Sequence, residues 1–219
     1  MRVTWLVICL IAVAGSGWAR PETKTFGFAN ALTINDTVIK DIPLNKNGQP
    51  PYYYQIKPDV EQKLGLHTLE NGIDSLQIRI WYGYAFKDSG QLVVLNNQGG
   101  QWSARFYNFA YHYDDQRAKL ERIAKTVVCR EPRSGWDNFS RRLFELRITT
   151  LPDITLIENY PVIADGDGIV IEVATKNKYR IYSYHEPAIG EKESVEEAKN
   201  VNAIIKLIKN EFAFRSLRR

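Results

Sequence analysis

Alternation of hydrophobic and polar residues marks the strands of this chain. From Leu76 to Tyr84, apolar residues at every second position are separated by Gln77, Arg79 and Trp81, which is the period-two pattern of a strand. Further strands are indicated by the segments QLVVLN, QWSARFYNFAYHYDD and AKTVVCRE. Because strands joined by short connections usually pair, the four segments predict an antiparallel meander.

The third of these strands carries large side chains on both faces. Trp102 and Phe106 share one face, whereas Tyr107 and Phe109 share the other. Such a strand is expected to lie centrally or to be covered twice. A hairpin follows near the C-terminus, because two alternating runs, GIVIEVA and YRIYSY, flank the polar turn TKNK.

Helical spacing of apolar residues appears in two places. The first is close to Ser134 and Asp137, which resemble a capping box, and it ends at the run TTLP. The second follows a capping box formed by Ser194 and Glu197. The two apolar faces are Trp136, Phe139, Leu143 and Leu146, and then Ala198, Val201, Ile205, Ile208 and Phe212.

Signals of regular secondary structure are weaker in the remaining segments. PDVEQKLGL predicts a short helix with Pro58 at its first position. Residues 20–57 are otherwise expected to be irregular, since Gly48, Pro50 and Pro51 interrupt regular structure. The order of elements predicts an α+β fold for residues 20–219, taken as one domain. In it an antiparallel sheet, a meander plus a C-terminal hairpin, carries two main helices.

The first nineteen residues have the layout of a secretory signal peptide. Arg2 precedes an apolar run from Trp5 to Ala14, and small residues at Gly17 and Ala19 precede the expected cleavage site. The run is shorter than the roughly 20 apolar residues that span a bilayer, which makes a retained anchor the less favoured alternative. We therefore expect an exported, soluble chain, periplasmic or extracellular, with no integral membrane segment after cleavage.

Charge and cysteine content argue against a nucleic-acid partner and against an internal disulfide. The net charge of the full chain is only +4 and its basic residues are interspersed with acidic ones, which argues against nucleic acid as a partner. Cleavage would remove Cys9 and leave Cys129 as the one cysteine, so no internal disulfide is expected.

Metal and cofactor chemistry finds little support in the sequence. The run DGDG at 165–168 departs from the spacing of a calcium loop and fits a turn before the hairpin. Zinc is not expected because His67, His112 and His185 are far apart and only one cysteine remains. We predict no metal and no cofactor.

Cys129 is the candidate nucleophile, with a histidine as base. The favoured interpretation is instead a small buried hydrophobe, because the cysteine lies in the apolar strand segment TVVCRE. Two Asn-x-Ser/Thr sequons occur, at Asn35 and Asn138, and they matter only where exported proteins are glycosylated.

Arg79 and Trp81 are the candidate ligand-binding residues. On a solvent-facing strand they would form a platform for a sugar, an aromatic group or a peptide. In the alternative interpretation a helix covers this face, Arg79 is paired and Trp81 belongs to the core; burial of most large aromatics favours this view.

Three segments, LQIRIWYGYAF, SGWDNF and VATKNKYRIYSYHEP, resemble an uncharacterised family of small exported bacterial proteins. The resemblance extends over the chain from about Tyr52 and implies an exported single domain, with no assigned activity. Two functions stay open. One is a non-enzymatic binding module for a protein, peptide or glycan; the other is a small exported hydrolase with a site assembled from distant loops.

Overall fold

The structure is a computed structural model that describes residues 38–83, 89–114, 119–161 and 168–213. Every described residue belongs to one compact unit, Ile34–Arg219. The signal-peptide prediction for residues 1–19 therefore lies outside the described residues.

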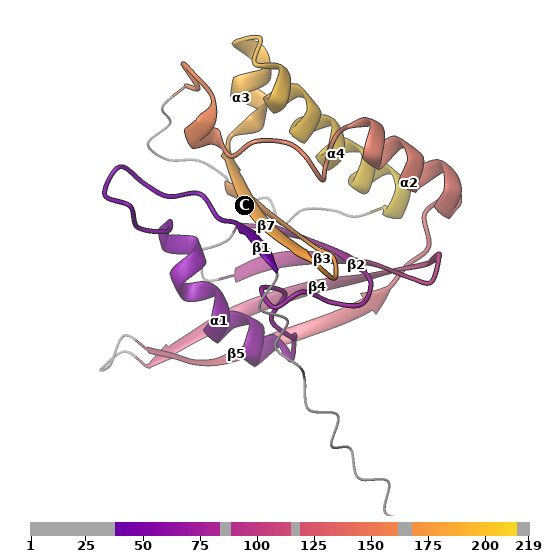
Figure 1. Ribbon diagram of the computed structural model, residues 1–219. Coiled ribbons are helices and arrows are strands. Elements are labelled where there is room, and N and C mark those ends of the chain that lie inside the picture. The colour runs from indigo at the N-terminus through magenta and orange to yellow at the C-terminus, as the bar shows by residue number, and fades with distance from the viewer. Residues whose placement is uncertain (1–37, 84–88, 115–118, 162–167, 214–219) are drawn as a thin grey trace, which may run out of the picture. The chain divides into compact units, whose positions relative to one another are not determined.

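In the described part of the chain, seven strands form one mixed sheet in the order β1-β7-β6-β2-β3-β4-β5 (Figure 1). Neighbours are antiparallel except β1 and β7, which are parallel. The strands are β1 Ile39–Asp41, β2 Leu76–Tyr82, β3 Ser89–Gln98, β4 Gln101–Asp114, β5 Lys119–Cys129, β6 Gly168–Ala174 and β7 Lys178–His185. The predicted meander is β2 to β5, and the predicted hairpin is β6 and β7.

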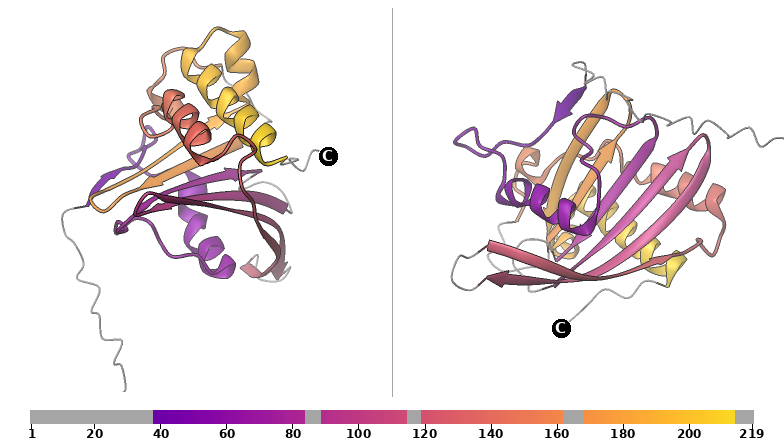
Figure 2. Two further views of the ribbon diagram at one scale, coloured as in Figure 1. Left: turned by 90° about the vertical axis from the view of Figure 1, so that its right-hand side faces the viewer. Right: turned by 90° about the horizontal axis from the view of Figure 1, so that it is seen from below.

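Helices lie on both faces of the sheet (Figure 2, left). One face carries α2 and α4, which are the two main helices predicted from the sequence, and the other carries α1. The helices are α1 Tyr52–Leu64, α2 Trp136–Glu145, α3 Pro187–Lys192 and α4 Glu196–Phe212, with a 3-10 turn η1 at Ile154–Leu156. This arrangement confirms the predicted α+β class.

Two hydrophobic cores follow from this layering. The core under α2 and α4 includes Ile78, Ile80 and Phe106, and the core under α1 includes Trp81 and Tyr107. Successive side chains of a strand point to opposite faces, so β2 and β4 each contribute to both cores. β4 lies between β3 and β5, in agreement with its prediction as a strand covered on both faces.

Both predicted helix starts were wrong in their caps. Gly135, with a φ of 78°, precedes α2, while the Ser134 N–H donates to the Glu211 carboxylate of α4 at 2.8 Å. Ser194 lies in the turn that ends α3, where its N–H donates to the Glu191 carbonyl. In both places a tertiary or neighbouring-helix contact replaces the local capping bond.

The segment 20–57 is less irregular than expected, because it contains β1 and the first half of α1. The predicted short helix exists but begins at Tyr52, so Pro58 lies inside it and not at its first position. The buried face of α1 comprises Lys57, Val60, Glu61 and Leu64. Because two of these four buried residues are charged, a search for apolar periodicity does not find this face of α1.

Candidate functional site

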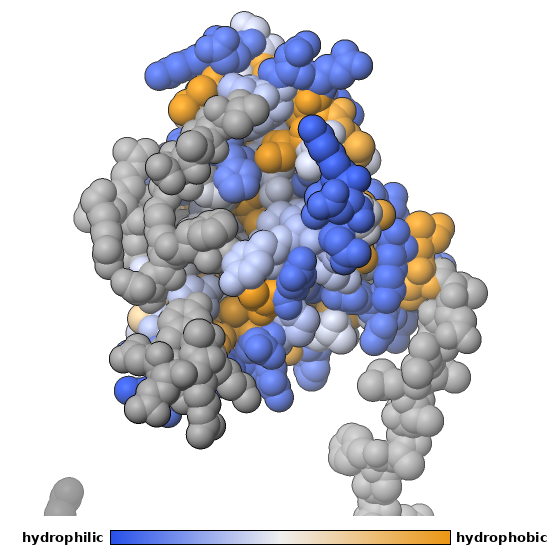
Figure 3. All heavy atoms as spheres, turned by 90° about the vertical axis from the view of Figure 1, so that its left-hand side faces the viewer, coloured by the Kyte–Doolittle hydropathy of each residue, from blue (hydrophilic) through white to orange (hydrophobic). Residues whose placement is uncertain are grey.

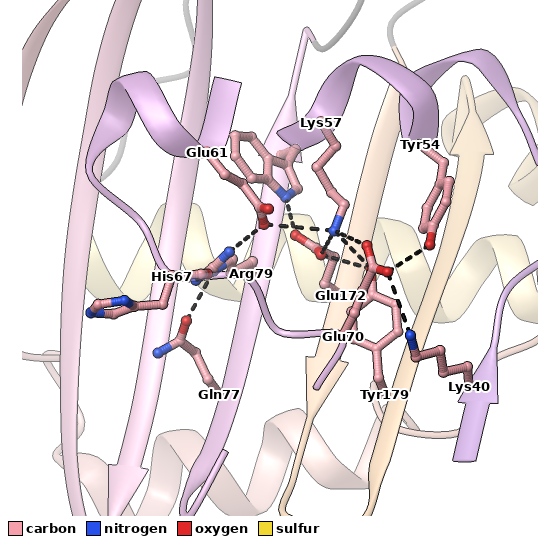
Figure 4. A network of polar contacts seen from close by, with 11 residues as sticks. Lys40, Tyr54, Lys57, Glu61, His67, Glu70, Gln77, Arg79, Glu172 and Tyr179 are labelled. Atoms are coloured by element: carbon pink, nitrogen blue, oxygen red, sulfur yellow. Dashed lines mark hydrogen bonds and ion pairs between the residues drawn. The ribbon is translucent and has the colours of Figure 1, made fainter. Parts of the chain in front are cut away.

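Charged side chains are concentrated between α1 and the sheet (Figure 4). α1 contributes Lys57 and Glu61, β2 contributes Arg79 and Trp81, and β6 contributes Glu172, each no more than 3 % exposed. We call this group the α1 network; its outer members are Lys40, Tyr54, Glu70, Gln77 and Tyr179. Helix and strands meet in it through polar contacts as well as apolar packing.

Glu172 is the centre of the α1 network. Its Oε1 accepts hydrogen bonds from Lys57 Nζ at 3.0 Å and from the Tyr179 hydroxyl at 2.8 Å. Its Oε2 accepts from Trp81 Nε1 at 2.7 Å. The carboxylate has no exposure to solvent, so these three donors replace its hydration.

Lys57 joins Glu172 to the rim of the network. Its Nζ lies 3.2 Å from Glu70 Oε1 and 3.7 Å from Glu61 Oε1. Glu70 is partly exposed, accepts from the Tyr54 hydroxyl at 2.8 Å and lies 3.9 Å from Lys40 Nζ. The network therefore reaches solvent at Glu70, whereas Glu172 and Lys57 are enclosed.

Each nitrogen of the Arg79 guanidinium donates a hydrogen bond. Its Nη1 donates to Glu61 Oε1 at 2.5 Å, its Nη2 to the His67 carbonyl at 2.6 Å, and its Nε to Gln77 Oε1 at 2.9 Å. The guanidinium thus connects β2 to α1 and to the loop that follows α1. Such fork-like bonding suits arginine, which presents donors in a fixed plane.

Burial and charge shift the pKa values of this network. Burial, then the neighbouring Glu172, raises the pKa of Glu61 to about 7, although Lys57 and Arg79 oppose the shift. Burial alone would lower the pKa of Lys57, but the negative charges of Glu172, Glu61 and Glu70 outweigh it and the pKa is raised. Lys57 is therefore a stable cation, and Glu61 is the carboxyl that can take up a proton near neutral pH.

The geometry of the α1 network is that of a structural connection. Its buried donors and acceptors bond to one another, which is the condition under which buried charges are tolerated. Arg79 and Trp81 lie at the base of α1 and do not face solvent; Trp81 is 0 % exposed. This placement matches the covered alternative, and ligand binding by the two residues stays a prediction.

The exposure of Cys129 differs from what its sequence context predicted. The cysteine is exposed at the end of β5, so the expectation of a small buried hydrophobe was wrong. β5 lies at the edge of the sheet, where the apolar segment TVVC has no covering strand among the described residues. His67 lies in the loop after α1, His112 on β4 and His185 at the end of β7. The described residues contain no group of three or more metal-ligating side chains.

Of the remaining sequence candidates, Gly168 and Asn138 lie among the described residues. Gly168 begins β6, whereas the rest of the 165–168 turn and the sequon at Asn35 lie outside the described residues. Asn138 lies in the first turn of α2, where its Nδ2 donates to the Ser134 carbonyl at 3.1 Å.

One cavity of about 230 Å³ lies at the α2 face beside the β6–β7 turn. The residues that line it are Leu76, Thr149, Thr150, Val173, Thr175, Lys178 and Arg180. The lining holds no carboxylate, cysteine or histidine. Arg180 already donates to the Thr149 and Leu151 carbonyls, at 2.6 and 2.7 Å. The lining of the cavity thus offers no carboxylate or histidine as a general base.

Exposed hydrophobic side chains give no broad docking surface on the face shown in Figure 3. There they form small groups separated by hydrophilic residues. Over the described chain, the exposed large hydrophobic residues are Ile39, Leu44, Tyr52, Val127, Val128, Phe144, Leu156 and Ile189. Of these, Val127 and Val128 are adjacent on one strand, β5.

β5 is the last strand of the sheet, and among the described residues no strand pairs with its outer side (Figure 2, right). The Arg130 N–H donates to the Ala104 carbonyl at 3.3 Å, which fixes the direction of the alternating backbone groups. Residues at an even number of positions from Arg130, such as Val128 and Thr126, direct their N–H and C=O groups toward β4. The N–H and C=O groups of the intervening residues point away from the sheet: Ile123, Lys125, Val127 and Cys129.

One half of this edge is protected and the other is not. Around Glu121 and Arg122 the strand carries charges and a bulge, both of which discourage pairing with other strands. From Thr126 to Cys129 it has no charge and no proline, and Val127 and Val128 are each 43 % exposed. The sequence predicted the strand but not its position at the edge, since apolar runs are typical of interior strands.

Comparisons with known proteins give no family: no family model matches the chain, and a search of curated proteins finds no match. The resemblance to exported bacterial proteins stays a prediction. Among the described residues, no helix combines the length and apolar character needed to cross a bilayer.

Proposed function

We propose that this chain is an exported, non-enzymatic interaction module that binds an extended segment of another polypeptide at the edge of β5. In this mode, called strand addition, the backbone of the bound segment supplies the hydrogen bonds and its side chains supply specificity. The observation that supports it most is the row of outward backbone groups at Ile123, Lys125, Val127 and Cys129.

Side chains next to this row also suit a bound strand. Val127 projects on the α1 face and Val128 on the α2 face, so a paired strand would find an apolar contact on each side. Lys125 and Arg130 flank the valines and donate to the Leu64 and Phe212 carbonyls, which holds both long side chains against the domain. Between them Val127 and Val128 are the exposed apolar side chains of the edge.

The alternative function, a small exported hydrolase, has less support. The buried carboxylates Glu61 and Glu172 are engaged by Arg79, Lys57 and Trp81. No described histidine lies within the polar contacts of Cys129. An interaction module requires only the exposed edge.

A selection from a random peptide library tests the proposal, with the chain from Arg20 as bait. We expect enrichment of extended peptides with alternating β-branched residues. Val127→Pro should abolish their binding because proline lacks the outward N–H, and edge strands tolerate proline. Val127→Thr, which keeps the N–H and the branched shape, should retain it. Peptides that bind Val127→Pro as well as the parent would contradict strand addition.

Export is tested separately with residues 1–19 fused to a reporter enzyme in a bacterial host. The signal-peptide layout predicts a reporter outside the cytoplasm and a processed chain that begins at Arg20. An uncleaved cytoplasmic reporter would refute this part of the proposal.

A further inference from the structure

We infer that the segment bound at β5 is β5 of a second copy of this chain, paired antiparallel about a two-fold axis at Val127. This inference rests on the proposed function, because it requires the same open edge. It adds the identity of the partner and the register of the pairing.

Backbone direction limits the registers that two β5 strands can adopt. In an antiparallel pair, residues whose N–H and C=O groups point into the shared seam stand opposite one another. On β5 these are Ile123, Lys125, Val127 and Cys129. Because only odd-numbered residues can oppose odd-numbered ones, the two-fold axis must fall at a residue and not between two.

Repulsion between like charges excludes two positions of the two-fold axis. An axis at Lys125 would place the two Lys125 side chains opposite each other. An axis at Thr126 would place Arg122 opposite Arg130 of the second copy. Like charges directly opposite on paired strands are destabilising.

The bulge and the end of β5 disfavour an axis near either end of the strand. The ladder between β4 and β5 skips Glu121 at a bulge, so an axis at Ile123 or Ala124 would pair the bulged part with the regular part. β5 ends at Cys129, so an axis at Val128 or beyond would leave a shorter ladder.

An axis at Val127 avoids both problems. Val127 then faces Val127 of the second copy, and Lys125 faces Cys129 of the second copy on either side. Glu131 of the second copy is the next residue along, diagonal to Lys125 and opposite in charge, a distance that long side chains can cross. On the other face Val128 meets Thr126. The register therefore covers both exposed valines without opposing like charges.

The contact is short, so the dimer should be reversible and depend on concentration. The five opposed pairs formed by residues 125–129 of the two copies bury far less surface than the roughly 1,200–2,000 Å² of a stable interface. Analytical ultracentrifugation of the chain from Arg20 over a concentration series should show a shift toward twice the monomer mass. Val127→Thr should keep the shift and Val127→Pro should lose it. A parent chain that stays monomeric throughout the series would overturn the inference.

Disulfide trapping tests the register itself. Lys125→Cys would place a new thiol opposite Cys129 of the second copy, within the Cα separation of about 5.5 Å that suits both a strand pair and a disulfide. With diamide as oxidant, we expect a covalent dimer for this variant. The parent and the Lys125→Cys/Cys129→Ser double variant should give none, because their thiols stand four residues apart across the seam. Equal cross-linking in all three would refute the Val127 register.

The inference and the proposed function can fail separately. If the chain is monomeric but selected peptides still depend on Val127, β5 binds a different polypeptide and only the self-pairing is wrong. If the peptides do not depend on Val127 either, strand addition at this edge is wrong as well.

Discussion

Glu172 shows how a single charged residue is tolerated inside this domain. It lies in the middle of an otherwise apolar strand, and Lys57, Tyr179 and Trp81 come from three other elements to bond it. Sequence patterns cannot find this arrangement, because residues 57 and 172 are brought together only by the fold. Apolar replacement of an entire buried pair is often neutral for stability, whereas removal of one partner leaves a buried charge uncompensated and is costly.

Removal of the Glu172 carboxylate should be costly. Glu172→Ala would leave Lys57 with fewer negative partners and the donors of Tyr179 and Trp81 unbonded, so we expect a loss of about 3–5 kcal/mol in the free energy of unfolding, measured in urea. Glu145→Ala is the matched control: its ion pair with Arg141 is more than half exposed and should contribute less than about 1 kcal/mol. Equal losses in the two variants would contradict the role of the α1 network.

Glu61 should make stability depend on pH in an unusual direction. Its pKa in the folded state, about 7, exceeds the ordinary value of 4.5, so the folded chain binds a proton more tightly than the unfolded chain. Its contribution to stability is complete below about pH 4.5 and is lost as the pH rises toward 7. The groups that face it are Lys57, Arg79, Glu70 and Glu172.

The measurement is the free energy of unfolding of the parent and of Glu61→Gln between pH 4.5 and 7.5. Glutamine cannot titrate, so the parent should lose stability relative to the variant as the pH rises. An identical pH slope for the two chains would show that Glu61 does not titrate in this range.

At the scale of elements, the apolar face of α2 was predicted from the sequence and the buried face of α1 was not. The apolar spacing of Phe139 and Leu143 survives in the structure because this face of α2 packs on an apolar core. The corresponding face of α1 contains Lys57 and Glu61, which look like solvent-facing residues in a sequence. The difference lies in the chemistry of the covered sheet face, which carries Arg79 and Glu172 under α1.

Adjacent residues of α2 provide a test of its packing. Leu143 is 0 % exposed and Phe144 is 41 % exposed. Leu143→Ala should lower the free energy of unfolding by about 2–5 kcal/mol, because it leaves a cavity in the core. Phe144→Ala should cost less than about 1 kcal/mol, as is usual for exposed positions. A reversed order in a denaturant titration would mean that α2 packs with a different face.

At the scale of the whole molecule, the α+β class, the meander and the hairpin followed from alternation and short connections. The order of strands in the sheet did not, because local patterns carry no information on which strand ends at an edge. This missing piece decides the function that we propose. Arg79 and Trp81 are buried, as the covered alternative expected, whereas the apolar TVVC segment was expected to be buried and is exposed.

Residue-resolved amide hydrogen exchange of β5, at low and at high protein concentration, tests the central claim most directly. We predict that the N–H groups of Thr126 and Val128 exchange slowly at both concentrations, because they bond to β4. Those of Lys125 and Val127 should exchange rapidly in dilute solution and slow markedly in concentrated solution, when a second strand covers them. Slow exchange of Lys125 and Val127 in dilute solution, or no change on concentration, would contradict an open edge that pairs with a second copy.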